Sequence, residues 1–224
     1  MNRPIRSYVL RQGRTTPAQR RALEELFPKY GLAFSPSTLD AKNICGRKAP
    51  LVLEIGSGMG ETTSAIAAAH PEADFIAVEV HGPGVGSLLN RVREHGLANV
   101  RVLRHDAVEV LEHMIGDASL AGVHLFFPDP WPKKRHHKRR MVQPAFAALL
   151  ARKLAPGAIV HAATDWPDYA EHMLSVFDGE KDLERAPRGL FERPPTKFEA
   201  RGRSLGHPIQ DLYFRRRGSA PAPR

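Results

Sequence analysis

Residues 51–70 read LVLEIGSGMGETTSAIAAAH, and this stretch decides the fold class. LVLEIG at 51–56 is an apolar run of strand length, and ETTSAIAAAH at 61–70 has the composition of a helix. Three closely spaced glycines stand at the junction, at Gly56, Gly58 and Gly60. A strand that passes through a glycine-rich turn into a helix is typical of an open α/β sheet. The stretch therefore predicts parallel strands joined by helices.

The same alternation continues toward the carboxyl terminus. Strands are predicted at 73–80, 100–106, 122–129 and 158–165, and helices at 85–96, 107–115, 144–154 and 166–177. The predicted strands are apolar along most of their length, as in sheets that helices cover on both faces. Two further strands are expected within 182–186 and 209–217, and residues 218–224 are expected to be a disordered tail. The predicted fold class is α/β, a Rossmann-like, mostly parallel sheet with helices on both faces.

The chain begins with a polar, basic extension at 1–48, ahead of the α/β domain predicted at 49–217. One helix is predicted in this extension, because Thr16 before Pro17 is a typical helix start and Gly31 a typical end. Arg3, Arg6, Arg11 and Arg14 stand before that helix. They predict a basic arm that contributes to binding a polyanion.

Composition excludes several protein classes. Of 224 residues, 42% are hydrophobic and 25% charged, which is typical of a globular protein with a core. The single cysteine, Cys45, excludes a disulfide scaffold, and the eleven histidines show no metal-ligand spacing. No apolar run approaches the roughly 18 residues of a membrane span, and the amino terminus lacks a secretory signal. We expect a cytoplasmic protein without a bound metal, either a monomer or a homodimer.

Charge is unevenly distributed along the chain. Residues 1–48 carry ten Lys and Arg against three acidic residues, and 129–224 carry nineteen against eleven. Residues 49–128, in contrast, carry four against ten. This distribution predicts a polyanion at the basic flanks and a ligand with positive charge at the acidic centre.

Each of the five main predicted strands ends in or near an acidic residue. These residues are Glu54, Glu79, Asp106, Asp129 and Asp165. Ligands of open parallel sheets bind beyond the carboxyl ends of the strands, so a row of acids at this edge predicts a ligand rich in donors or positive charge. For Asp106 and Asp165, capping of the following helix is an equally good explanation.

The glycine turn favours a cofactor with an adenosine end. A dinucleotide fingerprint requires its third glycine at position 61, but that residue is Glu61, which would repel a pyrophosphate at the helix start. Glu79 is suited to accept hydrogen bonds from two ribose hydroxyls, and Asp106 from an adenine amino group. S-adenosylmethionine also offers an ammonium and a sulfonium that suit an acidic centre. NAD is the second candidate.

A strongly basic stretch follows the strand predicted at 122–129. Residues 133–140 read KKRHHKRR, between a strand and a helix of the predicted core. This position favours phosphate binding over a merely solvated surface. Trp131 beside it is suited either to stack on a base or to pack in the protein.

Six stretches, in this order, resemble the bacterial tRNA (guanine-N7-)-methyltransferases. They are EIGSGMG, VEVHGPGVG, FPDPWPKKRHHKRR, ATDWPDYAEHML, TKFEARG and LGHPIQDLYF. The resemblance covers about residues 5–217; the glycine turn is common to many methyltransferases, whereas the third stretch and TKFE are specific to this family. It implies a seven-stranded class I methyltransferase fold. It also implies methyl transfer from S-adenosylmethionine to N7 of a variable-loop guanine, at position 46 of tRNA.

The resemblance also implies roles for individual residues. The cofactor would be bound by Glu54, Gly56, Gly58, Gly60, Glu79, Asp106 and Asp129, and Asp129 would also be catalytic. The substrate would be bound by Lys133, Asp165, Thr196, Lys197, Phe198 and Glu199, and the RNA contacted by Arg135, His136, His137, Lys138, Arg139 and Arg140. The residues alone leave open a methyltransferase of another RNA or of DNA, a nucleotide-cofactor dehydrogenase, and a non-catalytic RNA-binding module.

Overall fold

The computed structural model describes residues 6–8, 13–40, 44–195, 199 and 209–218. Within these residues one sheet contains eight strands in the order β1-β4-β3-β2-β5-β6-β8-β7. The strands are β1 (Gly31–Leu32), β2 (Leu51–Ile55), β3 (Asp74–Val78), β4 (Val100–Leu103), β5 (Leu120–Phe126), β6 (Leu154–Thr164), β7 (Leu183–Arg185) and β8 (Gln210–Arg216). Only β8 runs antiparallel to its two neighbours, β6 and β7. The predicted α/β fold with a mostly parallel sheet is confirmed.

The prediction of seven strands was wrong by one short edge strand. Strands β2 to β8 are the seven that the resemblance implies, and β1 pairs in parallel with β4 as an eighth. One helix was predicted between Thr16 and Gly31, but the structure has two short helices there, Pro17–Glu25 and Phe27–Tyr30. Gly31 is the C-cap of the second, and its extended backbone (φ −82°, ψ 151°) continues directly into the pairing with β4. A two-residue strand has no alternating pattern of its own, so the sequence carries no signal for it.

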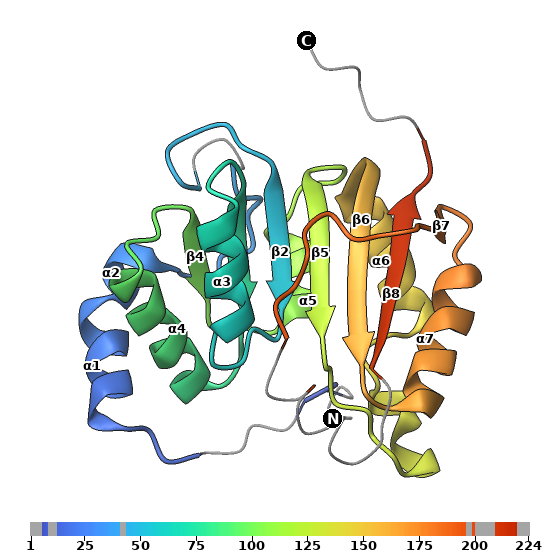
Figure 1. Cartoon of the computed structure of the whole chain (residues 1–224), viewed down its shortest axis with the longest axis horizontal. Helices are drawn as coiled ribbons and strands as arrows, with labels where there is room; N and C mark the ends of the chain where they lie inside the picture. Colours follow the sequence, from blue (N-terminus) through green and yellow to red (C-terminus); the bar gives the residue numbers. More distant parts are fainter. Residues whose placement is uncertain (1–5, 9–12, 41–43, 196–198, 200–208, 219–224) are drawn as a thin grey trace.

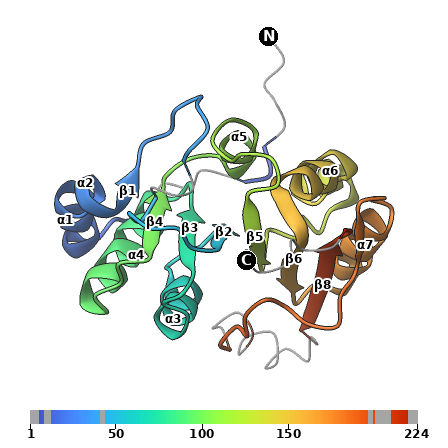
Figure 2. The same cartoon turned by 90° about the horizontal axis from the view of Figure 1, so that it is seen from above.

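Helices cover both faces of the sheet, as Figure 2 shows. They are α1 (Pro17–Glu25), α2 (Phe27–Tyr30), α3 (Glu61–Ala69), α4 (Gly82–Glu94), α5 (Ala107–His113), α6 (Pro144–Lys153) and α7 (Pro167–Asp178), with a 3-10 helix η1 (Lys134–Arg139). One hydrophobic cluster joins the sheet to α5, α6 and α7, and a second joins it to α1, α3 and α4. Successive residues of β2 serve the two faces in turn: Leu51 and Leu53 belong to the first cluster, and Val52 to the second.

Local signals explain how α1 begins and where it packs. The Thr16 side chain accepts a hydrogen bond from the Gln19 N–H, and the Gln19 side chain accepts one from the Thr16 N–H, which is a capping box. The predicted N-cap is therefore confirmed. At Gly86 of α4, an added Cβ would lie 2.5 Å from the Gln19 carbonyl oxygen, so this glycine allows α1 to approach α4 closely.

None of the helices named above covers one face of β5 and β6; the chain after β7 crosses this face instead, as the orange segment in Figure 1 shows. Phe191 in this segment stacks on His70, with ring centroids 4.0 Å apart, and approaches the ring of His124 edge-on. An added Cβ on Gly122 of β5 would lie 3.2 Å from Leu190, so small residues in β5 make room for the segment. Residues 186–195 thereby bring a distant part of the chain onto the middle of the sheet.

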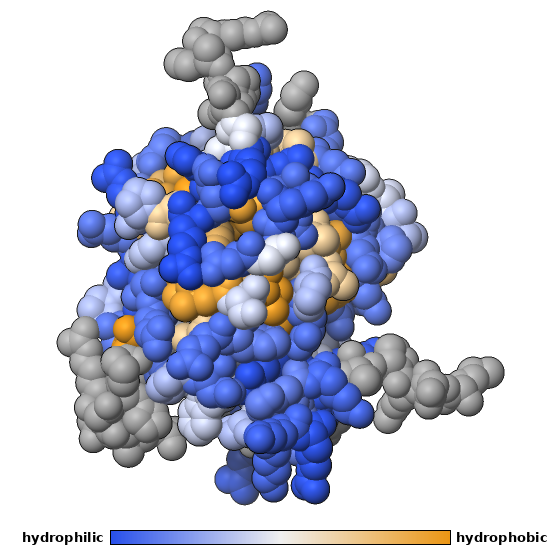
Figure 3. All heavy atoms as spheres, turned by 90° about the vertical axis from the view of Figure 1, so that its right-hand side faces the viewer, coloured by the Kyte–Doolittle hydropathy of each residue, from blue (hydrophilic) through white to orange (hydrophobic). Residues whose placement is uncertain are grey.

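Hydrophilic side chains make up most of the molecular face that Figure 3 shows. Figure 3 shows one hydrophobic patch amid hydrophilic atoms on the face that contains the β7 edge and α7. None of the helices described is both apolar and long enough to cross a membrane.

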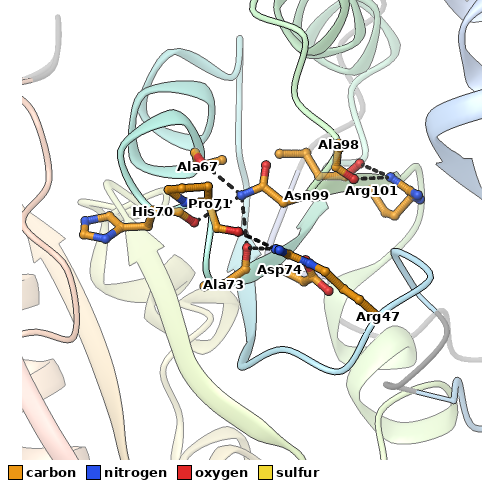
Figure 4. Close-up of polar contacts among 10 residues, drawn as sticks. Arg47, Ala67, His70, Pro71, Ala73, Asp74, Ala98, Asn99 and Arg101 are labelled. Atoms are coloured by element: carbon orange, nitrogen blue, oxygen red, sulfur yellow. Dashed lines mark hydrogen bonds and ion pairs between the residues drawn. The ribbon is translucent and has the colours of Figure 1, made fainter.

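A polar network holds the sheet together at the edge where β3 and β4 begin (Figure 4). Arg47 donates two hydrogen bonds to the buried carboxylate of Asp74, at 2.9 and 2.7 Å. The amide of Asn99 donates to the carbonyl oxygens of Ala67, His70 and Ala73, at 3.0 to 3.2 Å. These bonds satisfy carbonyl groups at the end of α3 and in the turn that follows it.

Replacing Asn99 by alanine is expected to lower the free energy of unfolding by about 1–3 kcal/mol, because buried carbonyl groups lose their donor. Urea denaturation measures the change. The control is Asn90→Ala, which removes a partly exposed amide whose contact with the Ala18 carbonyl is 3.5 Å long. Equal losses for the two variants would contradict a structural role for the Asn99 amide.

Candidate active site

The carboxyl ends of five neighbouring parallel strands carry one acidic residue each. Glu54 lies in β2, Glu79 directly after β3, Asp106 after β4, Asp129 after β5 and Asp165 directly after β6. Because β4, β3, β2, β5 and β6 are consecutive in the sheet, these residues follow one another along the lower edge in Figure 1. This is the edge at which ligands of open α/β sheets bind.

The glycine turn after β2 forms an open cradle at this edge. Gly56, Gly58 and Gly60 have φ values of 75°, 56° and 76°, a left-handed conformation that favours glycine. An added Cβ on Gly56 or Gly58 meets no atom within 4 Å, whereas one on Gly60 would lie 2.5 Å from Leu88. Gly60 thus serves the packing of α3 on α4, while Gly56 and Gly58 leave backbone open to a ligand.

Glu54 is a buried carboxyl group beside this cradle. Only 3% of the residue is exposed, and neither Glu54 Oε2 nor the neighbouring Ser57 Oγ has a hydrogen-bond partner among the described residues. Burial raises the pKa of Glu54 to about 7, and the adjacent Thr63 side chain acts in the opposite direction. Buried polar groups without partners are rare in folded proteins, so these two atoms are suited to bind a ligand that offers hydrogen-bond donors.

The raised pKa of Glu54 predicts a specific dependence of stability on pH. Its ionised form is disfavoured in the folded protein, so the ligand-free protein loses stability as the pH rises from about 4.5 to about 7. Glu54→Gln is expected to remove this loss and to stabilise the ligand-free protein by about 3 kcal/mol at pH 8, with little effect at pH 4.5. Urea denaturation at both pH values measures the difference. Glu94→Gln on α4 controls for the loss of one exposed charge; a gain for Glu54→Gln that is equal at both pH values would contradict the prediction.

Glu79 and Asp106 each bind a backbone N–H group at the same edge. Glu79 accepts from Gly58 N–H and from His81 N–H, both at 2.8 Å, and so ties the glycine turn to the start of α4. A carboxylate has about four acceptor positions, so Glu79 keeps capacity for a ligand. Asp106 accepts from Val108 N–H at 2.9 Å and is the N-cap of α5, which is the structural role that the sequence left open.

Two adjoining cavities meet at the glycine turn. One, of about 210 Å³, is lined by Glu79 and Asp129; the other, of about 300 Å³, is lined by Glu54 and the glycines of the turn. Gly56, Phe126 and Phe127 line both. Three of the predicted carboxylates therefore face one divided cleft. Asp106 instead lines a larger neighbouring cavity, of about 650 Å³, together with Arg139 and Arg140.

The loop that carries Asp129 is strained on both sides of this residue. Phe127 and Trp131 have φ values of 51° and 48°, which are unfavourable for side chains with a Cβ. Each such conformation costs about 1–3 kcal/mol and persists only where surrounding contacts enforce it, often at functional sites. Trp131 is fixed by a hydrogen bond from Nε1 to the Ser7 carbonyl oxygen and by Arg139, whose guanidinium lies 4.0 Å from the ring centroid.

The basic stretch forms η1, next to this loop. Lys133, Lys134, Arg135 and Lys138 are exposed, and His136 and His137 are half-buried. Burial and the cations around it, Arg135 first among them, lower the pKa of His136. Lys138 lines the cavity of about 650 Å³ beside the cleft, together with Ser7 and Asp106. None of the four exposed cations forms an ion pair among the residues described. They are suited to contact a phosphate backbone.

Arg139 and Arg140 have contacts within the protein. Arg140 is 3% exposed, pairs with Asp168, donates to the Pro130 carbonyl oxygen and lies over the ring of Tyr169. The expectation that Arg140 contacts RNA does not fit this position, because its guanidinium is enclosed; its observed contacts hold the Asp129 loop against α7. Arg139 donates to the carbonyl oxygens of Arg6 and Tyr8, at 3.2 and 3.3 Å.

The remaining predicted substrate residues lie at two places. Asp165 is half-buried after β6, the strand next to that of Asp129. Glu199 is 7% exposed and pairs with Arg193 at 2.7 Å. Thr196, Lys197 and Phe198, like Arg3 and Arg11 of the expected arm and most of the expected tail, lie outside the described residues.

Two residues near the amino terminus line the cleft, and the sequence did not predict this. Ser7 and Tyr8 line the cavity that contains Asp129, although more than 120 positions separate them from it in the chain. Burial raises the pKa of the Tyr8 hydroxyl, and the nearby Asp106 carboxylate adds to this shift. No signal in the sequence connects these two regions, because the contact depends on where the extension leaves the folded domain.

Solved structures similar to this chain share its fold. A 16S rRNA methyltransferase, KamB, superposes with a TM-score of 0.59 at 16% identity, over 81% of this chain and 95% of that protein. A precorrin-6y C5,15-methyltransferase from Geobacter metallireducens superposes with a TM-score of 0.53 at 11% identity, over 88% and 87%. These likenesses show a class I methyltransferase fold.

Sequence comparisons identify the family. A family model described as "Putative methyltransferase" matches residues 48–212. A tRNA (guanine-N(7)-)-methyltransferase from Nitrosomonas eutropha is 58% identical over 94% of this chain and 96% of its own length. One from Nitrosospira multiformis is 56% identical, over 98% and 97%. On these matches, which span nearly the whole chain, the protein belongs to the tRNA (guanine-N(7)-)-methyltransferase family.

Proposed function

We propose that this chain transfers a methyl group from S-adenosylmethionine to N7 of the guanine at position 46 of the tRNA variable loop, giving 7-methylguanosine. One observation carries the proposal. The buried, unpartnered Glu54 oxygen and the open glycine turn share a divided cleft with Asp129, and η1, which follows the Asp129 loop, carries exposed cations, of which Lys138 lines the adjoining cavity. A donor-rich small molecule and a polyanion therefore have adjacent sites. The names of the relatives agree with this arrangement.

The residues present fit S-adenosylmethionine, which when bound supplies a methyl group activated by a sulfonium. Glu54 and Ser57 offer buried acceptors for an ammonium group, and Gly56 and Gly58 allow close approach to backbone. Glu79 keeps acceptor positions for ribose hydroxyls, and the neighbourhood of Asp106 would receive the adenine. The acidic centre also suits the positive charge of the cofactor.

Methyl transfer to N7 mainly requires that the methyl donor and the guanine are held in line. N7 of guanine has a free lone pair and loses no proton on methylation, so no strong general base is required. Holding two reactants in line contributes as much as about 7–11 kcal/mol in well-oriented systems. The rigid sheet edge and the constrained loop around Asp129 suit this task.

Asp129 is the proposed catalytic residue. Positive charge appears on the purine during the transfer, and a nearby carboxylate stabilises it. The same carboxylate is able to accept from guanine N1–H or the exocyclic amino group and so to orient the base. Asp129 is exposed and lines the cleft, where a base is able to reach it.

Lys133, Asp165 and the stretch Thr196–Glu199 are proposed to hold the rest of the substrate. Asp165 follows the strand next to that of Asp129, which supports a role in binding a neighbouring edge of the base. The phosphate backbone is assigned to the exposed cations Lys134, Arg135 and Lys138 together with the half-buried histidines of η1.

The test is incubation of the protein with an unmodified tRNA transcript and methyl-labelled S-adenosylmethionine, followed by nucleoside analysis. The expected product is 7-methylguanosine, at one site per tRNA. A transcript with adenine in place of guanine 46 is the matched control and is expected to receive no label. Label in another nucleoside, label only in ribosomal RNA, or binding of NAD instead of S-adenosylmethionine would refute the proposal.

A further inference from the structure

One buried arginine joins three parts of the chain beside the proposed active site. Arg193 lies in the segment after β7, and only 7% of its side chain is exposed. It donates from Nε and Nη2 to the two carboxylate oxygens of Asp211 on β8, at 2.7 and 2.9 Å. It donates from Nη1 to Glu199 Oε2 at 2.7 Å. All three nitrogens of its guanidinium are therefore engaged.

Asp211 is itself held in place. His161 of β6 lies with Nε2 2.8 Å from Asp211 Oδ1, across the antiparallel β6–β8 pair. Burial alone would raise the pKa of Asp211, but the hydrogen bonds from His161 and Arg193 outweigh it and hold the pKa at about 2. Asp211 therefore stays ionised and anchors the Arg193 guanidinium to the sheet.

The same guanidinium also contacts the loop of the proposed catalytic residue. Its central carbon lies 5.5 Å from the ring centroid of Phe127, the strained residue two positions before Asp129. Phe127 lines both cavities of the cleft. Arg193 thus stands between the sheet, Glu199 and the Asp129 loop.

We propose that Arg193 is a positioning residue: it fixes the Glu199 carboxylate, through Asp211 on β8, at the place where Glu199 binds the guanine. The inference rests on the proposed function, in which Glu199 is a substrate contact. A planar guanidinium binds one carboxylate with two parallel hydrogen bonds and still directs a third donor elsewhere. A lysine ammonium carries the same charge without this fixed geometry.

This difference makes Arg193→Lys the decisive variant. It keeps a positive charge opposite Asp211 and Glu199, so no buried carboxylate is left without a counter-charge. We expect kcat for tRNA methylation to fall by about 10- to 100-fold, because a misplaced contact disturbs alignment. The dissociation constants for S-adenosylmethionine and for tRNA are expected to change by less than roughly twofold, since phosphate contacts dominate RNA affinity.

The matched control is Arg185→Lys at the β7 edge. Arg185 also donates two hydrogen bonds to one carboxylate, that of Asp178, at 2.9 and 2.6 Å, but it is exposed. This variant is expected to keep wild-type kcat. A double-mutant cycle with Glu199→Gln then asks whether Arg193 acts through Glu199. In the Glu199→Gln background, Arg193→Lys is expected to lower kcat by less than roughly twofold.

The kcat values of these variants either support or overturn the proposed role of Arg193. An unchanged kcat for Arg193→Lys, or losses that multiply in the double variant, would overturn it. If Arg193→Lys reduces the folded fraction seen by circular dichroism, Asp211→Asn takes its place in the same cycle, because it loosens the anchor and leaves Arg193 opposite Glu199. A wild-type protein that makes no 7-methylguanosine would instead refute the proposed function, and this inference with it.

Discussion

Replacing Asp129 by alanine is expected to lower kcat for tRNA methylation by about 10²–10³-fold, the usual loss when one group that stabilises transition-state charge is removed. Asp129 lies in a loop between Phe127 and Trp131, and both of these residues have strained backbone conformations. The contacts that enforce these conformations also hold the Asp129 carboxylate at the cleft. Binding of S-adenosylmethionine is expected to weaken less than kcat, because Glu54 and the glycine turn remain. Single-turnover methylation and equilibrium cofactor binding measure the two effects.

Asp129→Asn separates charge from shape at this position. The amide keeps the size and an acceptor oxygen but removes the negative charge, so a loss close to that of Asp129→Ala would assign the effect to charge. Asp182→Asn, an exposed residue next to β7, is the control and is expected to leave kcat unchanged. Near-normal turnover of Asp129→Ala would exclude Asp129 from the mechanism.

Affinity for tRNA is expected to fall steeply with salt. If four to six cations contact phosphates, the logarithm of the association constant falls against that of salt concentration with a slope of about −3 to −5. Between 50 and 200 mM salt this amounts to a loss of roughly 60- to 1000-fold. Filter binding over this range measures the slope.

The exposed residues of η1 are expected to make the phosphate contacts that produce this salt dependence. Replacing Arg135 and Lys138 together by glutamine is expected to make the slope shallower by about 1.5, because two phosphate contacts are lost. The same change at Arg215 and Arg217, exposed at the opposite edge of the sheet, is the control and is expected to leave the slope unaltered. A wild-type slope near zero would reject η1 as the RNA contact.

Much of the architecture was predictable from local patterns. Alternating apolar runs and helical segments place strands β2 to β6 and helices α3 to α7, because these periods reflect which faces are buried. Thr16 with Pro17 marks the start of α1 for an equally local reason, a side chain that satisfies a backbone N–H three residues away. The two-residue β1 was not predictable, since it exists only through pairing with β4.

In the candidate site, too, some features were predictable from the sequence and others were not. Strand ends rich in acids indicate the ligand-binding edge, and the buried Glu54 Oε2, which has no partner among the described residues, agrees with that interpretation. Whether an individual charge is available to a ligand was not predictable. Arg140 and Arg135 are indistinguishable within a basic run, yet Arg140 is enclosed against Tyr169 and Asp168 while Arg135 is exposed.

What this sequence determines by itself is the order of its elements and the sheet edge at which ligands bind, because hydrophobic period, caps and glycine turns act over a few residues. Only the tertiary structure decides which polar groups meet: Arg193 with Asp211 and Glu199, and the Trp131 indole N–H with the Ser7 carbonyl oxygen. Such pairs join segments that are separate in the chain, and their geometry follows from the packing of the whole sheet. Burial then determines which of these charged groups are committed to the fold and which remain for RNA.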